Sequence, residues 1–109
     1  MEQINKIELQ GNVGTLRINE VGDNNQVLHF SLATNYAYKS KEGNVIETTW
    51  HNVVVWKNRN MPDFKLLKKG SAVHVIGRVK TSKYTSNDGV EKQVHEVIAS
   101  RLEIISDEE

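Results

Sequence analysis

Apolar and polar side chains alternate with a period of two along most of this chain, and this pattern limits the fold more than any other feature. Strict alternation is typical of β-strands that bury one face. In the second alternating run, for example, Leu28, Phe30 and Leu32 fall on one face and His29 and Ser31 on the other. The pattern predicts five strands, over residues 4–14, 26–38, 47–57, 71–84 and 91–105.

Turn-forming sequences separate the five runs. Residues 20–26 and 39–46 each contain glycine and asparagine, which favour turns and loops. Asp88-Gly89, between the fourth and fifth runs, is a strong signal for a β-hairpin. The first, second and fourth runs are therefore predicted to end in turns, and the turn after the fourth run carries the hairpin signal.

Residues 61–70 break the alternation and predict one short helix. The segment has residues that favour helix ends, namely Pro62, Asp63, Lys68, Lys69 and Gly70. We expect Phe64 and Leu67 to face the core, with Leu66 as a further candidate. The order of elements is then three strands, a helix and two strands.

That order is typical of an all-β, five-stranded OB-fold, a Greek-key barrel with one short helix between strands 3 and 4. OB-folds bind oligonucleotides or oligosaccharides. Gly11, Gly14 and Gly77 interrupt the predicted strands. Glycines and bulges allow the sharp coiling that a small barrel needs, although loosened strand ends are the alternative interpretation.

The length and composition indicate one small domain. The 109 residues suffice for a single core, and the absence of cysteine excludes disulfides and thiolate metal sites. The first ten residues lack the features of a secretory signal, and no apolar run approaches the ~20 residues of a membrane span. We expect a cytoplasmic domain over residues 1–105, followed by a short acidic end over 106–109, with no membrane association.

Positive charge is concentrated in the middle of the chain, although the formal net charge is zero. Residues 36–92 hold eleven lysines and arginines against five acidic residues, whereas both flanking segments are net acidic. A polyanion responds to such a local field rather than to the total charge. An ordinary mixed surface remains the alternative on charge alone.

The third run raises the question of why both tryptophans lie on one strand face. Trp50 and Trp56 share a face, while Val53 and Val55 lie on the opposite face with His51. The valines already supply an apolar inner face, so a core role explains the tryptophans poorly. We expect both to be exposed platforms for stacking.

Metal binding and catalysis are not expected. His29, His51, His74 and His95 fall in four different predicted strands, with no short ligand spacing. No carboxylate lies in an apolar stretch that would raise its pKa, and no nucleophile or phosphate-loop motif is present. We therefore expect a binding protein without a cofactor, not an enzyme.

Basic residues interleaved with aromatic rings point to single-stranded nucleic acid as the partner. Cations follow the phosphates of such a strand, and the bases stack on aromatic rings. The candidate phosphate contacts are Lys39, Lys41, Lys57, Arg59, Arg78, Lys80 and Lys83.

Over about residues 4–105 the chain resembles the bacterial-type single-stranded DNA-binding proteins. The stretches that match are NKIELQGNVG, FSLATN, ETTWHNVVVW, LLKKGSAVHVIGRVKTSKYTSNDG and EVIASRLEII, in order and at family-like spacing. The resemblance implies an OB-fold homotetramer, associated with the nucleoid. It also implies that the protein coats single-stranded DNA without sequence preference during replication, repair and recombination.

The resemblance also implies four stacking residues. They are Tyr38 after LAT, Trp50 before His51, Trp56 at the end of the valine run, and Tyr84 after TSK. Tyrosine stands at 38 and 84 where the family commonly has tryptophan, and a smaller ring stacks less strongly.

Two segments depart from the family pattern. The segment over residues 15–25 lacks the common Asp-Pro-Glu sequence, which leaves any DNA contact from it open. The chain closes on SDEE, without the family's flexible linker and terminal Pro-Phe. Recruitment of other proteins through a C-terminal tail is therefore not expected.

Two other functions fit the pattern less well. A primosomal accessory OB-fold dimer is similarly short, and would act mainly as a protein-interaction module. An oligosaccharide-binding OB-fold also uses aromatic platforms, but the positive middle segment argues against it.

Overall fold

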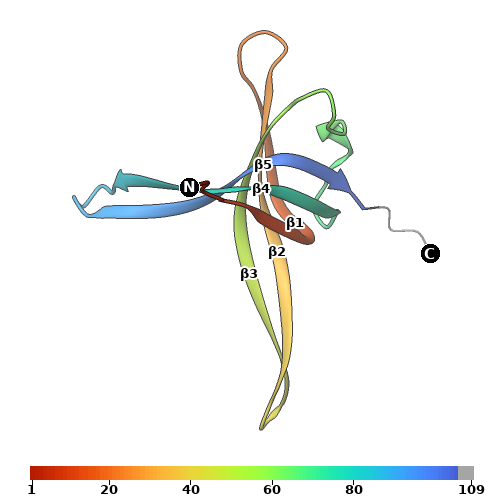
Figure 1. Cartoon of the computed structure of the whole chain (residues 1–109), viewed down its shortest axis with the longest axis vertical. Coiled ribbons are helices and arrows are strands. Elements are labelled where there is room, and N and C mark those ends of the chain that lie inside the picture. The colour runs from red at the N-terminus through yellow and green to blue at the C-terminus, as the bar shows by residue number, and fades with distance from the viewer. Residues whose placement is uncertain (106–109) are drawn as a thin grey trace.

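Five long strands form one closed barrel in the computed structural model, which describes residues 1–105 (Figure 1). The strands are β1 (Ile7–Glu20), β2 (Gln26–Ser40), β3 (Gly43–Trp56), β4 (Ala72–Thr85) and β5 (Glu91–Ile104). Their order around the barrel is β1-β2-β3-β5-β4, and all neighbours are antiparallel except β3 and β5. The predicted OB-fold class is confirmed. The predicted acidic end, 106–109, lies outside the described residues.

The hairpin of β2 and β3 is longer than the sequence predicted. Residues 39–46 were expected to be a loop, but the two strands stay paired until Ser40 meets Gly43, so only Lys41 and Glu42 form the turn. The prediction was wrong because cross-strand hydrogen bonds join backbone groups and do not require apolar side chains. The result is an arm that extends away from the barrel, downward in Figure 1.

The predicted helix is a single 3-10 turn, η1 (Phe64–Leu66), capped by the side chain of Asp63. Leu67 is already extended. The backbone N–H of Gly70 donates to the carbonyl of Val13, and the N–H of Val13 donates to that of Ser71, so the chain is drawn into the barrel before a helix can continue. Within residues 1–105, no helix is long and apolar enough to cross a membrane.

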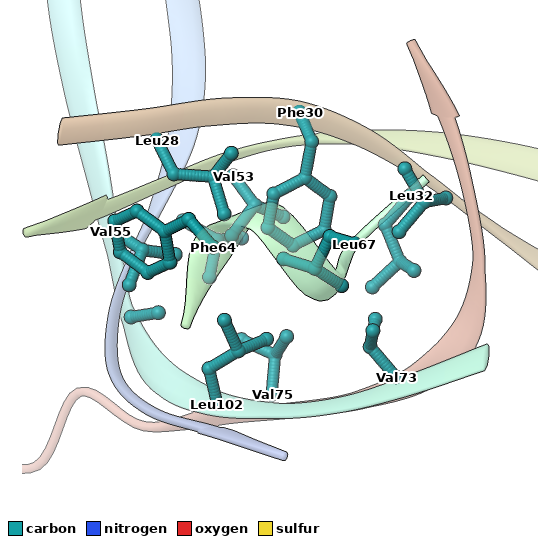
Figure 2. Packing of buried hydrophobic residues seen from close by; sticks show 13 residues of the cluster. Leu28, Phe30, Leu32, Val53, Val55, Phe64, Leu67, Val73, Val75 and Leu102 are labelled. Carbon is teal, nitrogen blue, oxygen red and sulfur yellow. The ribbon is translucent and has the colours of Figure 1, made fainter. Parts of the chain in front are cut away.

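The core fills the barrel from all five strands and from η1. Figure 2 shows Phe64 and Leu67 among strand side chains such as Leu28, Phe30 and Val75. The prediction that Phe64 and Leu67 face the core is confirmed, whereas Leu66 is exposed. A one-turn helix can bury only the side that lies against the barrel, so Leu66 is excluded from the core.

Two bulges coil the strands where glycines interrupt them. In β1, Gly14 and Thr15 together lie opposite Ser31, and in β5 the extra residue Ser100 lies beside Gly77 of β4. A Cβ on Gly77 would lie 2.2 Å from the carbonyl oxygen of Ile98, so only glycine permits this close approach. The expectation that glycines serve strand coiling, not loosened ends, is confirmed for Gly14 and Gly77, whereas Gly11 lies in regular pairing with Val73.

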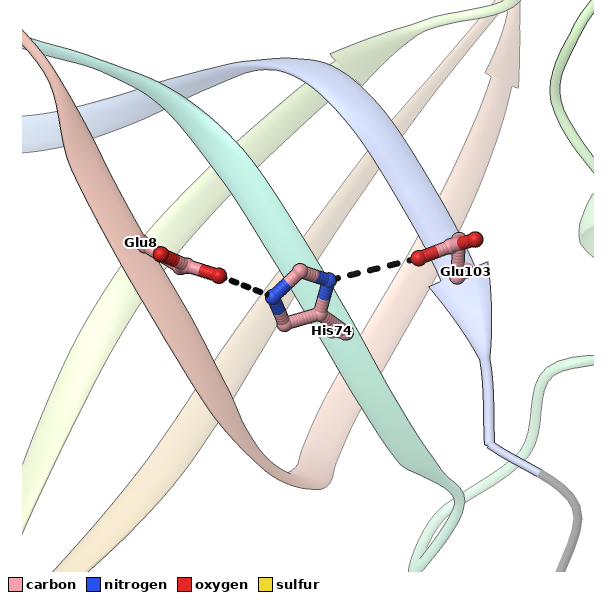
Figure 3. A network of polar contacts seen from close by, with 3 residues as sticks. All are labelled: Glu8, His74 and Glu103. Atoms are coloured by element: carbon pink, nitrogen blue, oxygen red, sulfur yellow. Dashed lines mark hydrogen bonds and ion pairs between the residues drawn. The ribbon is translucent and has the colours of Figure 1, made fainter.

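His74 joins three strands on the outside of the barrel (Figure 3). Its Nε2 lies 2.6 Å from a carboxylate oxygen of Glu8 on β1, and its Nδ1 lies 3.4 Å from one of Glu103 on β5. The hydrogen bond to Glu8, with a further contribution from Glu103, raises the pKa of His74 above its usual value. The imidazolium form therefore links β1, β4 and β5.

We expect the contribution of His74 to stability to disappear at alkaline pH. Because its pKa is raised by folding, the stabilisation is fully present below the unfolded pKa of about 6.5 and is lost as pH rises through the folded pKa. Urea denaturation between about pH 5.5 and pH 8.5 should show the difference between the protein and His74→Gln shrinking as pH rises.

Comparing the protein with His74→Gln at each pH isolates the contribution of His74 to stability from that of His51, which both proteins retain. Burial lowers the pKa of His51, so that residue changes stability in the opposite sense, with a loss as pH falls. A difference between the two proteins that stays constant over the whole pH range would contradict the role given to His74.

Candidate nucleic-acid interface

The two faces of β3 differ as the alternation predicted. Val53 and Val55 are buried in the core, whereas the side chains of Trp50 and Trp56 are 60% and 51% exposed. The two tryptophans are six residues apart, about 20 Å along a strand. Their exposure on one strand face is confirmed, and their contact with nucleic acid stays a prediction.

The bulge in β1 provides the surface on which Trp50 lies. A Cβ on Gly14 would approach Cζ3 of Trp50 to 2.6 Å and Cη2 to 3.1 Å, so the six-membered ring packs directly over this glycine. Ser31 on β2 fixes the bulge, because its Oγ accepts a hydrogen bond from the backbone N–H of Thr15 at 2.9 Å. Residues of β1 and β2 therefore orient Trp50 while much of it remains exposed.

An open groove of about 420 Å³ crosses the strands beside this ring. Its lining comes from four strands: Thr15, Leu16, Arg17, His29, Phe30, Ser31, Asn52, Val53, Val54 and Glu96. Asn52 and Val54 are the two residues that separate the tryptophans on their shared face of β3. The groove therefore runs through the region between Trp50 and Trp56. Arg17 and His29 contribute polar groups to its lining.

Tyr38 lies on the other face of the β2–β3 arm. Trp50 pairs with Ala33, so its side chain lies on the same face of the arm as Ala33. Tyr38 lies five residues beyond Ala33 on β2, an odd number, so its side chain lies on the opposite face. Tyr38 is exposed and its ring lies beside that of Tyr36. One flat ligand cannot reach Trp50 and Tyr38 together, so a bound strand must pass around the arm.

The remaining predicted aromatic residue lies on the β4–β5 arm, which points to the left in Figure 1. Tyr84 is exposed near the end of this arm and pairs with Lys92. Arg78 and Lys80 occupy the same face of β4 as Tyr84, whereas Lys83 falls on the other face. The turn of the arm is fixed by Asp88, whose pKa is lowered chiefly by a hydrogen bond from Ser86.

All the predicted phosphate contacts are exposed, and they form three groups. Lys39 and Lys41 lie at the end of the β2–β3 arm, Lys57 and Arg59 follow β3, and Arg78, Lys80 and Lys83 lie on β4. Within residues 1–105, none of these seven lies within 4.0 Å of a carboxylate oxygen. Lys57 has a contact of another kind, since its Nζ lies 5.1 Å from the centre of the Phe64 ring.

Sequence reasoning gave no binding role to Arg17 and His29, which line the groove, and did not include Tyr36 on the arm among the stacking residues. Arg17 pairs with His29 across β1 and β2, so their proximity depends on a register that follows a bulge. Tyr36 was recognisable from its spacing of two residues from Tyr38. Over residues 1–105, His, Asp and Glu side chains form no group of three that could hold a metal ion.

Comparison with known proteins assigns this geometry to one family. The single-strand binding protein family matches residues 4–105. A single-stranded DNA-binding protein of Xanthomonas campestris pv. campestris is 36% identical over 106 residues, covering 94% of this chain and 60% of the relative. A mitochondrial single-stranded DNA-binding protein of Danio rerio is 31% identical over 116 residues, covering 97% of this chain and 79% of the relative.

Solved structures give the same result. A Plasmodium falciparum SSB in complex with ssDNA superposes with a TM-score of 0.79 and 32% identity, covering 97% of this chain and 98% of that one. The chain spans about 60% of the length of the bacterial relatives that it matches.

Proposed function

This chain belongs to the single-strand binding protein family, and from that membership we propose that it binds and coats single-stranded DNA without sequence preference. The binding is an equilibrium in which no bond is made or broken. Bases stack on Tyr38, Trp50, Trp56 and Tyr84, and lysines and arginines contact the phosphates.

The observation that carries this proposal is the exposure of both tryptophans on the outer face of a strand whose inner face is filled by valines. Trp50 and Trp56 are 60% and 51% exposed, so each leaves an apolar ring surface available to a ligand on the same face of the strand. A nucleobase offers a flat apolar face of similar size to the indole ring, whatever its hydrogen-bonding edge. Stacking therefore supports binding that is independent of sequence.

The positions of the cations support a bound strand that follows a curved path. The groove between the tryptophans lies on the barrel, Lys39 and Lys41 lie on one arm, and Lys80 lies on another. Arg17 adds a cation within the groove, and we include it among the phosphate contacts. The strand is proposed to pass from the groove toward the two arms.

Binding of oligo-dT is expected to weaken steeply with salt. Each phosphate contact in a single-stranded complex contributes about −0.7 to the slope of log K against log salt, so the seven predicted contacts and Arg17 together give about −5.6. Duplex DNA of the same length should bind far more weakly, because paired bases cannot stack on the protein. Titrations that follow tryptophan fluorescence at several salt concentrations measure both effects.

A pair of charge variants sharpens this test. Lys80→Gln should reduce the slope by about 0.7, whereas Lys65→Gln, an equally simple change on the exposed side of η1, should leave it unaltered. A flat salt response, or equal affinity for duplex and single strand, would show that the proposed function is wrong.

We further propose that the chain assembles as a homotetramer and acts in replication, repair and recombination, as the family resemblance implies. Between Ile7 and Gly11, β1 pairs with β4 on one side, while its pairing with β2 begins at Asn12. Within the described chain this leaves one edge of β1 unpaired, and such an edge can pair with a second copy about a two-fold axis.

Light scattering at micromolar protein concentration is expected to give four times the mass of the 12.4 kDa chain. Val13 donates its backbone N–H toward β4, so the N–H of Gln10, on the alternate positions, faces the unpaired edge. Proline at Gln10 should lower the mass because it removes this backbone donor. A mass of two chains for the unaltered protein would favour the interaction-module alternative.

A further inference from the structure

Tyr36 and Tyr38 form a pair of rings on one face of the β2–β3 arm. The ring centres are 6.1 Å apart, and the ring planes differ by 29°. The side chain of Tyr36 is 67% exposed, which makes it one of the most exposed large side chains on the strands. Its hydroxyl and ring face have no role in the core, so the fold alone does not account for the pair.

The spacing of the two rings is close to that needed to hold a planar base. Residues two apart on a strand are separated by about 6.6–6.8 Å. Stacked bases are about 3.4 Å apart, so one base between two parallel rings needs about 6.8 Å. The observed separation of 6.1 Å has to widen by only about 0.7 Å, which small side-chain rotations can provide.

We propose that Tyr36 and Tyr38 act as a clamp that holds one nucleobase of single-stranded DNA between their rings. This inference rests on the proposed function and adds to it a binding position on the arm and a binding residue, Tyr36. A ring on each face of one base binds through stacking alone, so the clamp accepts any base.

The neighbouring groups determine on which side the DNA backbone passes. Glu47 pairs directly with Tyr36 across the arm, so a carboxylate lies on the β3 side of the clamp. The pairing of β2 with β1 ends at Ala33, and beyond it the edge of β2 away from β3 is open. Phosphates therefore pass along the open edge of β2, away from Glu47 and toward Lys41 in the turn.

Crosslinking and affinity measurements test the clamp. Irradiation of the complex with an oligo-dT that contains 5-iododeoxyuridine should attach DNA to both Tyr36 and Tyr38, as mapped by mass spectrometry. Tyr36→Ala should weaken binding of an oligo-dT of about 16 nucleotides by about 5- to 30-fold. Tyr36→Phe keeps the ring and should bind within about two-fold of the unaltered protein.

A matched control and a double variant distinguish a clamp from non-specific apolar binding by the arm. Ile46, 68% exposed, lies on the opposite face of the same arm, and Ile46→Ala should leave affinity unchanged. Because both rings hold one base, Tyr36→Ala with Tyr38→Ala should lose less than the product of the two single losses.

The possible failures point to different errors. If Tyr36→Ala binds normally while Trp50→Ala binds weakly, the clamp is wrong and the proposed function stands. Equal losses in Tyr36→Ala and Ile46→Ala, or independent losses from the two tyrosines, also overturn the clamp. If no variant changes affinity because oligo-dT does not bind at all, the proposed function itself fails.

Discussion

Trp50→Ala and Trp56→Ala are each expected to weaken the binding of single-stranded DNA by about 1–3 kcal/mol. Each indole ring is more than half exposed, so its removal takes away a stacking surface without opening a large cavity in the core. The free energy of unfolding should fall by no more than about 1 kcal/mol. Fluorescence titration with oligo-dT and urea denaturation of the same samples measure the two quantities separately.

Each variant also isolates the fluorescence of the other tryptophan. Trp56→Ala leaves Trp50 as the sole tryptophan, and Trp50→Ala leaves Trp56, since the chain has two tryptophans. Oligo-dT should quench the remaining ring in each variant, because a stacked base quenches an indole. Normal binding by both variants, together with a much lower stability, would show that the tryptophans serve the fold and not the ligand.

Phe64→Ala is expected to have the largest effect on stability, a loss of about 3–5 kcal/mol in the free energy of unfolding. The ring of Phe64 is fully buried where η1 closes the barrel, and its removal leaves a cavity among the strand side chains. It also removes the ring that faces the ammonium group of Lys57. For a domain whose total stability is about 5–15 kcal/mol, this is a substantial fraction.

Leu66→Ala is the matched control, because Leu66 lies in the same turn and is exposed. Its effect on unfolding by urea should be within about 0.5 kcal/mol. The folded fraction of Phe64→Ala should still bind oligo-dT with nearly normal affinity, since Phe64 offers no exposed surface to a ligand. Comparable losses of stability in the two variants would contradict the assignment of η1 as the element that closes the core.

Local patterns in the sequence determined which way most strand residues face. Alternation of side chains follows from backbone geometry within one strand and needs no knowledge of its neighbours. This is why the valines and tryptophans of β3 could be assigned to opposite faces. Turn chemistry is equally local, and Asp88-Gly89 correctly marked the hairpin between β4 and β5, where Gly89 has a φ of 83°.

The length of each element depended on pairing partners that are distant in the sequence. Polar residues between 39 and 46 resembled a loop, but β2 and β3 pair through them because each strand supplies the other's backbone partners. The residues after Phe64 had the composition of a helix, yet hydrogen bonds to Val13 draw Gly70 and Ser71 into the barrel. Local propensity is a weak influence when tertiary contacts compete with it.

The candidate interface therefore depends both on local sequence patterns and on the tertiary structure. The sequence by itself predicted the strands and the outward direction of Trp50 and Trp56 from a period of two, and a small β-barrel from the order of the strands and the short helix. Only the tertiary structure decided that Trp50 rests on Gly14, that Arg17 faces the groove beside it, and that Tyr38 lies on the opposite face of its arm. These relations depend on strand order, register and bulges, which bring together residues that no local pattern connects.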